Sequence, residues 1–406
     1  MTNVIKKPEL LAPVGDWKML HAAIKGGADA IYFGLDKLNM RAKAQNFTLD
    51  NLTELTSICR SNNVDTHLTL NSIVYESELV ELDEILVSAK KAGVTMIICW
   101  DMSVVSKCIQ YEMPFCISTQ ASISNSASAH YYKQLGAKRI VLARECSLDM
   151  IKVIKKNTGM EIETFVHGAM CVAVSGRCFM SHHVFGNSAN KGECIQPCRR
   201  EFRIYDESDD YSLLIGTDYV MSPKDLCTIE FIDELIESGI DSFKIEGRKR
   251  SPEYILKVVS AYRKAIDFHA EGKLTLEIKK ELLKELESVY NRGFSSGFYH
   301  DKPSGNDYTI KYGSSATTRK VYVGKVVNYF KKTNIAQVKI ESQNLELGAS
   351  GYIIGDTTGV VDVKFDAMQV DGNEVEIAEK GDDLTFYCEE VLRRNDKLFK
   401  IVDVKN

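Results

Sequence analysis

The chain has 406 residues, of which 44% are hydrophobic and 26% are charged, and its formal net charge is -5. This composition excludes a disordered or collagen-like chain, and a chain of this length can bury one large core or two. Because no apolar run reaches the roughly 18 residues of a membrane span and no signal-peptide segment begins the chain, we expect a soluble, cytoplasmic protein.

A short apolar run followed by a stretch with helical spacing occurs eight times along the chain. The predicted strands are 9–13, 29–34, 64–71, 94–100, 115–119, 138–143, 161–166 and 241–246. The predicted helices are 16–26, 49–62, 78–92, 102–112, 125–136, 148–157, 225–238 and 252–271. Since the strands show no polar alternation, they fit a parallel sheet buried on both faces, and eight such units predict an α/β fold of the TIM-like (β/α)8 type. An open doubly wound sheet is the alternative, but no G-x-G-x-x-G follows the first strand.

Two segments depart from this repeat. The connection between the seventh and eighth strands is much longer than the others, and it predicts a cysteine-rich insertion over 168–224. After a polar helical stretch at 275–290, the pattern changes near 318 to short alternating strands with glycine turns. We therefore expect a barrel domain over 1–315 and a small all-β domain, itself a barrel, over 318–406.

Polar side chains follow several predicted strands at the face where TIM barrels carry their chemistry. Arg41, Arg144 and Arg248 predict a site for an anionic ligand, because the planar guanidinium matches carboxylate or phosphate. The alternative is that these charges pair with neighbouring acids and seal the barrel mouth. Asn71 and Gln120 end the third and fifth strands and are further candidates for substrate binding.

Three titratable residues at the same face are candidates for catalysis. Glu145 and Glu246 follow the sixth and eighth strands, where a carboxylate can move a proton. His167 follows the seventh strand and has three alternative roles. It can donate a hydrogen bond to a sulfur of a metal cluster, donate a proton to substrate, or form a hydrogen bond with the insertion. We favour the hydrogen bond with the insertion.

Five of the eleven cysteines are grouped in or just after the insertion, whereas the other six are scattered through apolar runs and are interpreted as core residues. The grouped residues are Cys171, Cys178, Cys194, Cys198 and Cys227. The first four follow the pattern Cys-x6-Cys-x15-Cys-x3-Cys, without the paired C-x2-C knuckles of zinc ribbons. Such wide spacing suits an iron–sulfur cluster, which needs four thiolates. A structural zinc and a Cys171–His167 nucleophile pair are the alternatives.

At these residues the chain resembles the collagenase-like peptidase family of unknown catalytic type. The resemblance lies in EIETFVHGAMCVAVSGRCFMS, GECIQPCRR, SPKDLC, DSFKIEGRKRSPEY and NRGFSSGFYHDKP, and it extends over nearly the whole chain. Despite the family name, the resemblance implies oxygen-independent hydroxylation by an iron–sulfur protein with prephenate as the hydroxyl source. Length and a single β domain are most similar to the branch that forms 5-hydroxyuridine at the tRNA wobble position. Ribosomal RNA hydroxylation and proteolysis are the alternatives.

The resemblance also implies the cofactor, and Cys171, Cys178, Cys194 and Cys198 match the family's cysteine motif. Cys227 is a fifth candidate, so four of these five would hold a [4Fe–4S] cluster. Prephenate is a dicarboxylate, which suits the three arginines physically.

The implied partners are the anticodon loop of tRNA and a paralogous protein, and a non-catalytic role in a larger complex is a further alternative. A splayed base would stack on Tyr205, Tyr254 or Phe185. The residues predicted to contact RNA are Lys191, Arg199, Arg200, Lys249, Arg250, Arg319 and Lys320.

Overall fold

The protein is described by a computed structural model covering residues 6–42, 45–200, 202–208, 210–215, 222–309 and 313–404. Eight parallel strands close into a barrel, because the last of them pairs with both the seventh and the first. They are β1 (Glu9–Pro13), β2 (Ala30–Phe33), β3 (Asp65–Leu70), β4 (Met96–Cys99), β5 (Phe115–Ile117), β6 (Arg139–Val141), β7 (Glu161–Ala169) and β11 (Ser242–Ile245). The predicted TIM-like barrel is therefore confirmed.

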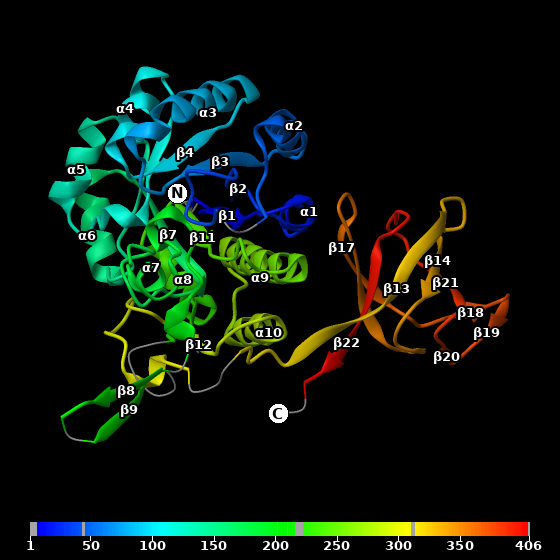
Figure 1. Cartoon of the computed structure of the whole chain (residues 1–406). Coiled ribbons are helices and arrows are strands. Elements are labelled where there is room, and N and C mark those ends of the chain that lie inside the picture. Colours follow the sequence, from blue (N-terminus) through cyan, green and yellow to red (C-terminus); the bar gives the residue numbers. More distant parts are fainter. Residues whose placement is uncertain are drawn as a thin grey trace.

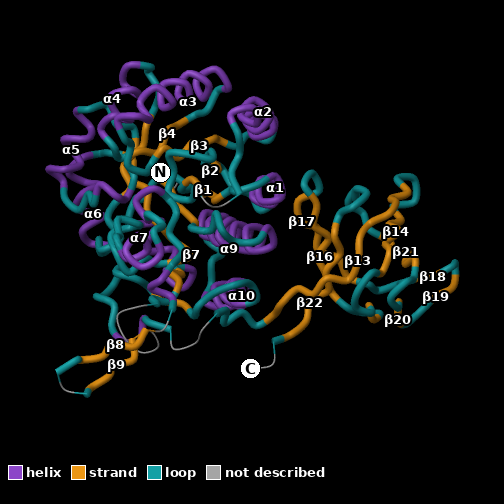
Figure 2. The backbone as a smooth tube through the Cα atoms, viewed as in Figure 1, coloured by secondary structure: helices purple, strands orange, loops and turns teal. Residues whose placement is uncertain are grey.

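Helices surround this barrel on its outside (Figures 1 and 2). They are α1 (Trp17–Lys25), α2 (Leu52–Ser61), α3 (Leu79–Ala92), α4 (Met102–Gln110), α5 (Ser126–Gln134), α6 (Leu148–Thr158), α8 (Ile232–Glu237) and α9 (Pro252–Ala270), followed by α10 (Leu276–Glu287). Local chemistry fixes their ends: the Asp16 carboxylate accepts from the Met19 N–H at 2.8 Å before α1. Gly93 takes the left-handed conformation that ends α3.

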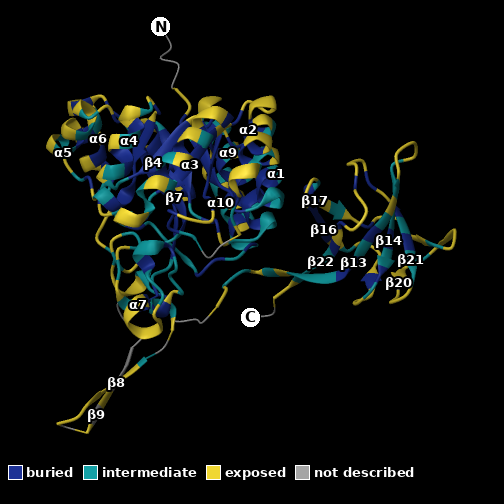
Figure 3. Ribbon diagram, turned by 45° about the horizontal axis from the view of Figure 1, so that its top comes forward, coloured by how far each residue is buried: buried dark blue, intermediate teal, exposed yellow. Residues whose placement is uncertain are grey.

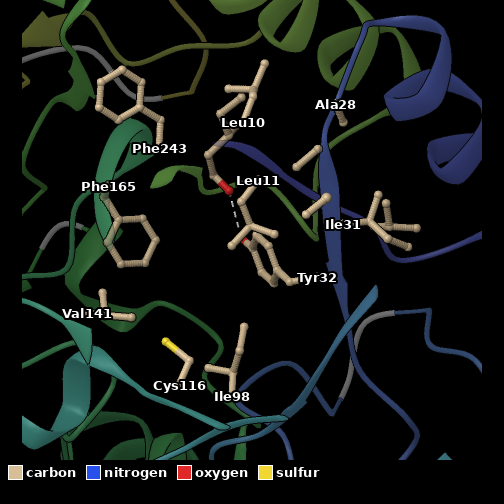
Figure 4. Close-up of a cluster of buried hydrophobic side chains, with 14 of the residues drawn as sticks. Leu10, Leu11, Ala28, Ile31, Tyr32, Ile98, Cys116, Val141, Phe165 and Phe243 are labelled. Atoms are coloured by element: carbon tan, nitrogen blue, oxygen red, sulfur yellow. Dashed lines mark hydrogen bonds between the residues drawn. The ribbon is translucent and has the colours of Figure 1, made fainter. Parts of the chain in front are cut away.

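The middle of the barrel is a packed apolar core. Figure 4 shows side chains from separate strands gathered there, among them Tyr32, Ile98, Val141 and Phe165. All four are buried, which explains why the strands read as continuous apolar runs rather than as alternating ones. This core leaves polar side chains at both ends of the barrel.

The cysteine-rich insertion leaves the barrel from an extended β7 and returns through a strand that the sequence did not predict. β10 (Asp225–Cys227) pairs antiparallel with β7, with Asp225 opposite Ala169. The helix predicted over 225–238 is therefore wrong at its start, because these residues gain their hydrogen bonds from β7. β12 (Phe294–Ser295) adds in parallel to β10.

Within the insertion the described residues form one short helix and a hairpin. These elements are α7 (Met180–Phe185), β8 (Phe202–Asp206) and β9 (Tyr211–Ile215). Figure 3 shows α7 and the hairpin projecting away from the barrel, with mostly exposed residues.

The C-terminal part is all-β, as predicted, and consists of antiparallel sheets. Its strands are β13 (Thr318–Phe330), β14 (Ile335–Ile340), β15 (Leu345–Glu346), β16 (Ser350–Gly355), β17 (Gly359–Lys364), β18 (Gln369–Val370), β19 (Asn373–Glu374), β20 (Ile377–Ala378), β21 (Asp383–Tyr387) and β22 (Lys397–Asp403). It contacts the barrel beside α1, where Lys25 pairs with Glu390 at 2.6 Å. None of the helices in the described ranges is long and apolar enough to cross a membrane.

Candidate functional site

A cavity of about 120 Å³ opens at the C-terminal ends of the barrel strands, beneath the insertion. Six residues that the sequence placed at this face line it. They are Arg41, Asn71, Gln120, Arg144, Glu246 and Arg248. Cys171, Cys194 and Cys198 complete the wall from the insertion side. The barrel mouth and the cysteine-rich insertion thus form a single site.

Glu246 is held ionised by the arginines around it. The Arg41 guanidinium donates to Glu246 at 2.9 Å. Burial by itself raises the pKa of Glu246, but the charges of Arg41, Arg144 and Arg248 outweigh it and lower the pKa to about 2. A carboxylate with this pKa anchors cations and is a poor proton carrier near neutral pH.

Within the described ranges, neither Arg248 nor Arg144 forms an ion pair with a carboxylate, although the charge of Glu246 acts on both. Arg248 donates to the Thr69 hydroxyl at 3.1 Å, and burial followed by repulsion from Arg41 lowers its pKa to about 10. Arg144 donates to the Ala169 carbonyl at 2.9 Å, and its Nε atom is buried without a partner. Burial lowers the pKa of Arg144 as well. Both guanidinium groups therefore have capacity to bind an incoming anion.

The cavity wall carries more positive than negative charge. Its basic residues are Arg41, Arg144, Arg199, Lys244, Arg248 and Lys249. Among the described lining residues Glu246 is the only acid, and Lys244 is already paired with buried Glu163 at 2.7 Å. This excess suits a ligand with two negative charges better than a ligand with one.

The two amide side chains are fixed in place by local hydrogen bonds. The Asn71 side-chain oxygen accepts from the Met40 N–H at 3.2 Å. Gln120 donates to the Asn71 carbonyl at 3.1 Å and accepts from the Ser118 hydroxyl. Asn71 and Gln120 therefore present a rigid polar edge to the cavity.

Four of the five grouped cysteines lie together. Cys171 is exposed, and Cys178, Cys194 and Cys198 are partly exposed. Burial raises the pKa of the Cys198 thiol and Arg199 lowers it, while each of the other three sulfurs also acts on it. Backbone N–H groups donate to the sulfur of Cys178 at 3.4 Å and to the sulfur of Cys194 at 3.3 Å.

Cys227 lies apart from this group. It is 6% exposed on β10, where Tyr262 contacts its sulfur at 3.9 Å. Burial raises the pKa of the Cys227 thiol to about 12. The structure therefore gathers Cys171, Cys178, Cys194 and Cys198 and separates Cys227 from them.

The spacing of the four sulfurs bears on which metal they fit. Tetrahedral zinc with Zn–S bonds of ~2.3 Å holds its sulfurs ~3.8 Å apart. Across the part of the chain that the structure describes, no three of these sulfurs lie within 4.8 Å of one another. An iron–sulfur cluster also accepts four thiolates, around a larger core, so this all-thiol donor set is compatible with it.

Two predicted catalytic residues do not reach the cavity. His167 is 1% exposed and its ring lies against Tyr254, Tyr262 and Phe294. Burial, with a smaller contribution from Arg250, lowers the pKa of His167 to about 3. β7 runs on past this residue, which places it within the sheet. Glu145 is exposed and is absent from the cavity wall.

Gly168 lets the seventh and eighth strands meet closely at the mouth. Its φ is +104°, a conformation that side chains rarely adopt, and a Cβ there would overlap the Glu246 carbonyl oxygen. The exit of β7 and the Glu246 segment are thus in direct contact.

The sequence analysis did not name several residues that line the cavity. The two-residue period of a β-strand could have identified them. Thr69 stands two residues before Asn71, and Lys244 two residues before Glu246, so each pair shares a strand face. Tyr32 also lines the cavity, from β2.

The predicted RNA contacts are scattered. Tyr254 is fully buried, whereas Tyr205 is 67% exposed. Lys191 pairs with Glu78 at 2.6 Å, and Lys320 pairs with Glu253 at 2.7 Å. Of the rest, Arg199 and Lys249 line the cavity, Arg250 lies over the ring of Tyr290, and Arg200 and Arg319 are exposed.

The family described as Peptidase family U32 matches residues 15–309. The chain belongs to this family. A collagenase of Porphyromonas gingivalis W83 is 38% identical over 97% of both chains. An uncharacterised protease of Methanocaldococcus jannaschii is 40% identical over 96% of this chain and 97% of its own. The tRNA hydroxylation protein P1 of Bacillus subtilis is 35% identical over 92% of this chain and 90% of its own. Relatives with similar sequence identity to this chain are thus named for two different activities, proteolysis and tRNA hydroxylation.

Proposed function

We propose that this U32 protein hydroxylates tRNA, forming 5-hydroxyuridine at the wobble position without oxygen and with prephenate as the hydroxyl source. The observation that carries the proposal is the joining of two features in one cavity. Cys171, Cys194 and Cys198 line it from one side, with Cys178 near Cys198, and its wall also carries Arg144 and Arg248, which form no ion pair among the described residues. The relatedness to a tRNA hydroxylation protein supports the same chemistry.

Cys171, Cys178, Cys194 and Cys198 would hold a [4Fe–4S] cluster, with zinc as the alternative metal. When bound, such a cluster supplies one-electron chemistry or an iron coordination position at the cavity wall. Arg199 and Lys249 lie on the same wall, where their positive charge would offset the negative charge of a bound cluster and its ligands.

The arginines would bind the two carboxylates of prephenate. Arg248 and Arg144 have free donor capacity, while Arg41 is oriented by Glu246. Two bidentate contacts fix a dicarboxylate in one orientation, so that its hydroxyl group faces a defined position on the wall.

Proton transfer falls to Lys249 rather than to the carboxylates that the sequence suggested. Burial and the charge of Arg41 lower the pKa of Lys249, which makes its ammonium a stronger acid. Glu246 stays ionised, and Glu145 lies outside the cavity. Replacing C5–H of uridine by C5–OH with hydroxide from prephenate releases one proton and two electrons, so the reaction needs an external redox carrier protein that accepts the two electrons. A paralogous protein is our separate proposal for a binding partner.

Proteolysis, which the names of two relatives suggest, lacks its machinery in the cavity. A cysteine peptidase needs a histidine beside the nucleophile. Among the described residues that line the cavity there is none, and His167 is buried against Tyr262.

Nucleoside mass spectrometry of total tRNA from a deletion strain tests the proposal. The strain is complemented with wild type, Cys171→Ala, or the matched control Cys227→Ala. We expect wild type and Cys227→Ala to restore 5-hydroxyuridine and Cys171→Ala not to restore it. The Cys227→Ala protein itself is expected at a reduced level. Unchanged 5-hydroxyuridine in the deletion strain, with loss of a hydroxylated cytidine in ribosomal RNA, would move the substrate to the ribosome. Loss of gelatin cleavage alone would support the peptidase alternative.

A further inference from the structure

We propose that the outer surface of the insertion binds the single-stranded loop of the RNA substrate, an inference that rests on the proposed function. We name this surface the insertion face. It consists of Phe179, Phe185 and Tyr205 together with Arg177, Arg200 and Arg203. None of these residues lies on the barrel itself.

Three aromatic rings on this face are unusually exposed for their type. Phe179 is 75% exposed, Tyr205 is 67% exposed and Phe185 is 37% exposed. Burying a phenylalanine ring is favourable by itself, so several exposed rings on one projecting segment indicate a binding surface. Phe179 is the N-cap of α7, which contains Phe185, and Tyr205 is on β8; Figure 3 shows α7 and the hairpin standing clear of the barrel.

Arginines lie on the same segment as these rings, and one of them contacts a ring. The Arg200 guanidinium lies 4.7 Å from the centroid of the Phe185 ring, and Arg203 is exposed on β8. Between residues 171 and 205 the sequence has five basic and two acidic side chains, although the whole chain has a net charge of -5. Aromatic rings interleaved with arginines are the pattern by which proteins bind single-stranded nucleic acid, because rings stack on bases and cations contact phosphates. A protein partner would need no such excess of positive charge.

The face is continuous with the cavity. Arg177 donates to the Gln120 carbonyl at 3.1 Å and lies over Trp100, so it joins the insertion to the barrel mouth. Phe179 directly follows Cys178, whose sulfur accepts from the Met180 N–H. An RNA loop resting on the insertion face would therefore place a neighbouring base at the cavity entrance, where a single-stranded base can be splayed at low cost.

Fluorescence anisotropy of the full-length protein with a labelled anticodon stem–loop RNA tests this surface. The variants are Phe179→Ala and Arg200→Ala. The matched controls are Phe330→Ala, in which the ring lost is 46% exposed on β13, and Arg394→Ala, at an exposed position of the C-terminal part. Since Phe179 is mostly exposed, its variant is expected to fold, and circular dichroism checks this.

We expect Phe179→Ala to weaken binding about tenfold through lost stacking. Arg200→Ala should lower the slope of log Kd against log salt by about 0.7. The two controls should bind as wild type does. The inference is overturned if Phe179→Ala binds as tightly as Phe330→Ala, or if wild type binds a duplex as well as the stem–loop. Loss of a co-purifying protein from Phe179→Ala at unchanged RNA affinity would also overturn it.

The two proposals fail differently. If 5-hydroxyuridine depends on the gene but the face variants bind RNA normally, the hydroxylase proposal stands and the insertion face falls. If the face binds the stem–loop but no hydroxylated nucleoside depends on the gene, the face stands as an RNA site and the hydroxylation falls.

Discussion

The two ends of the barrel both bury charged side chains, but they balance these charges differently. At the N-terminal end, Arg139 pairs with Glu9, Glu161 and Glu163, and Glu163 also accepts from Lys244. At the C-terminal end, Arg41 and Glu246 form the one direct ion pair among the described cavity residues, and Arg144 and Arg248 share the charge of Glu246 without pairing with it directly. A closed network stabilises the fold, whereas an open one retains charge for a ligand.

The largest expected contrast comes from removing one arginine at each end. Arg139→Met leaves the partly buried Glu9 and the buried Glu163 with too few partners, and we expect a loss of about 3–5 kcal/mol in the free energy of unfolding. Arg248→Met removes a buried cation whose desolvation and repulsion from Arg41 outweigh its attraction to Glu246, and we expect a change below about 1 kcal/mol. Urea unfolding of both variants measures the difference, and equal losses would contradict the comparison.

The second prediction concerns the pH dependence of the stability, which involves His67 at the N-terminal end of the barrel. Burial lowers the pKa of His67 from 6.5 to about 4, so the folded state holds this ring neutral. Its contribution to stability is complete above pH 6.5 and is lost as the pH falls towards 4, by roughly 3 kcal/mol in total. Urea unfolding between pH 7 and pH 4 should show this slope, with His167 acting in the same direction. The His67→Leu variant should show a shallower slope, and an unaltered slope would exclude His67 as its source.

At the C-terminal end of the barrel, the charge of the arginines predicts how tightly an anionic ligand binds. Arg248→Met should weaken binding of prephenate by about ten- to a hundredfold, because one charge-assisted contact is lost. Isothermal titration calorimetry measures this, with the exposed Arg394→Ala as control. Unchanged affinity would mean that the dicarboxylate binds elsewhere.

The smallest effect is expected from the group that positions Arg248. Thr69→Val removes the hydroxyl to which Arg248 donates at 3.1 Å while keeping nearly the same volume. We expect about a threefold loss of prephenate affinity, within the usual range for one neutral hydrogen-bond partner. A Thr69→Ser variant keeps the hydroxyl and should bind as wild type does.

The sequence predicted the barrel well because its strands are buried on both faces and its helices carry clear end signals. It failed at 225–227, where the pairing partner is the far end of β7 and nothing local marks a strand. From the sequence alone, Asp225 and Cys227 are predicted to begin a helix. They form a strand because they pair with β7.

For the site, knowing that strand ends meet was enough to place Arg41, Arg144 and Glu246 on one wall. The position at a strand end does not decide which of two successive residues faces the cavity. The sequence therefore predicted both Arg144 and Glu145 as site residues, and only Arg144 lines the cavity. Arg199 depends on the path of the insertion, which periodicity does not describe. The separation of Cys227 from the other cysteines likewise arises only from its place in β10.

The antiparallel pairing of β7 with β10 gives the insertion a closed base. Because Ala169 and Asp225 lie opposite each other, the insertion leaves and rejoins the barrel at one position, and none of the eight barrel strands lies within it. A change in the length or sequence between these two residues therefore need not move any barrel strand. The cover of the cavity can thus change in evolution while the barrel wall beneath it keeps its geometry.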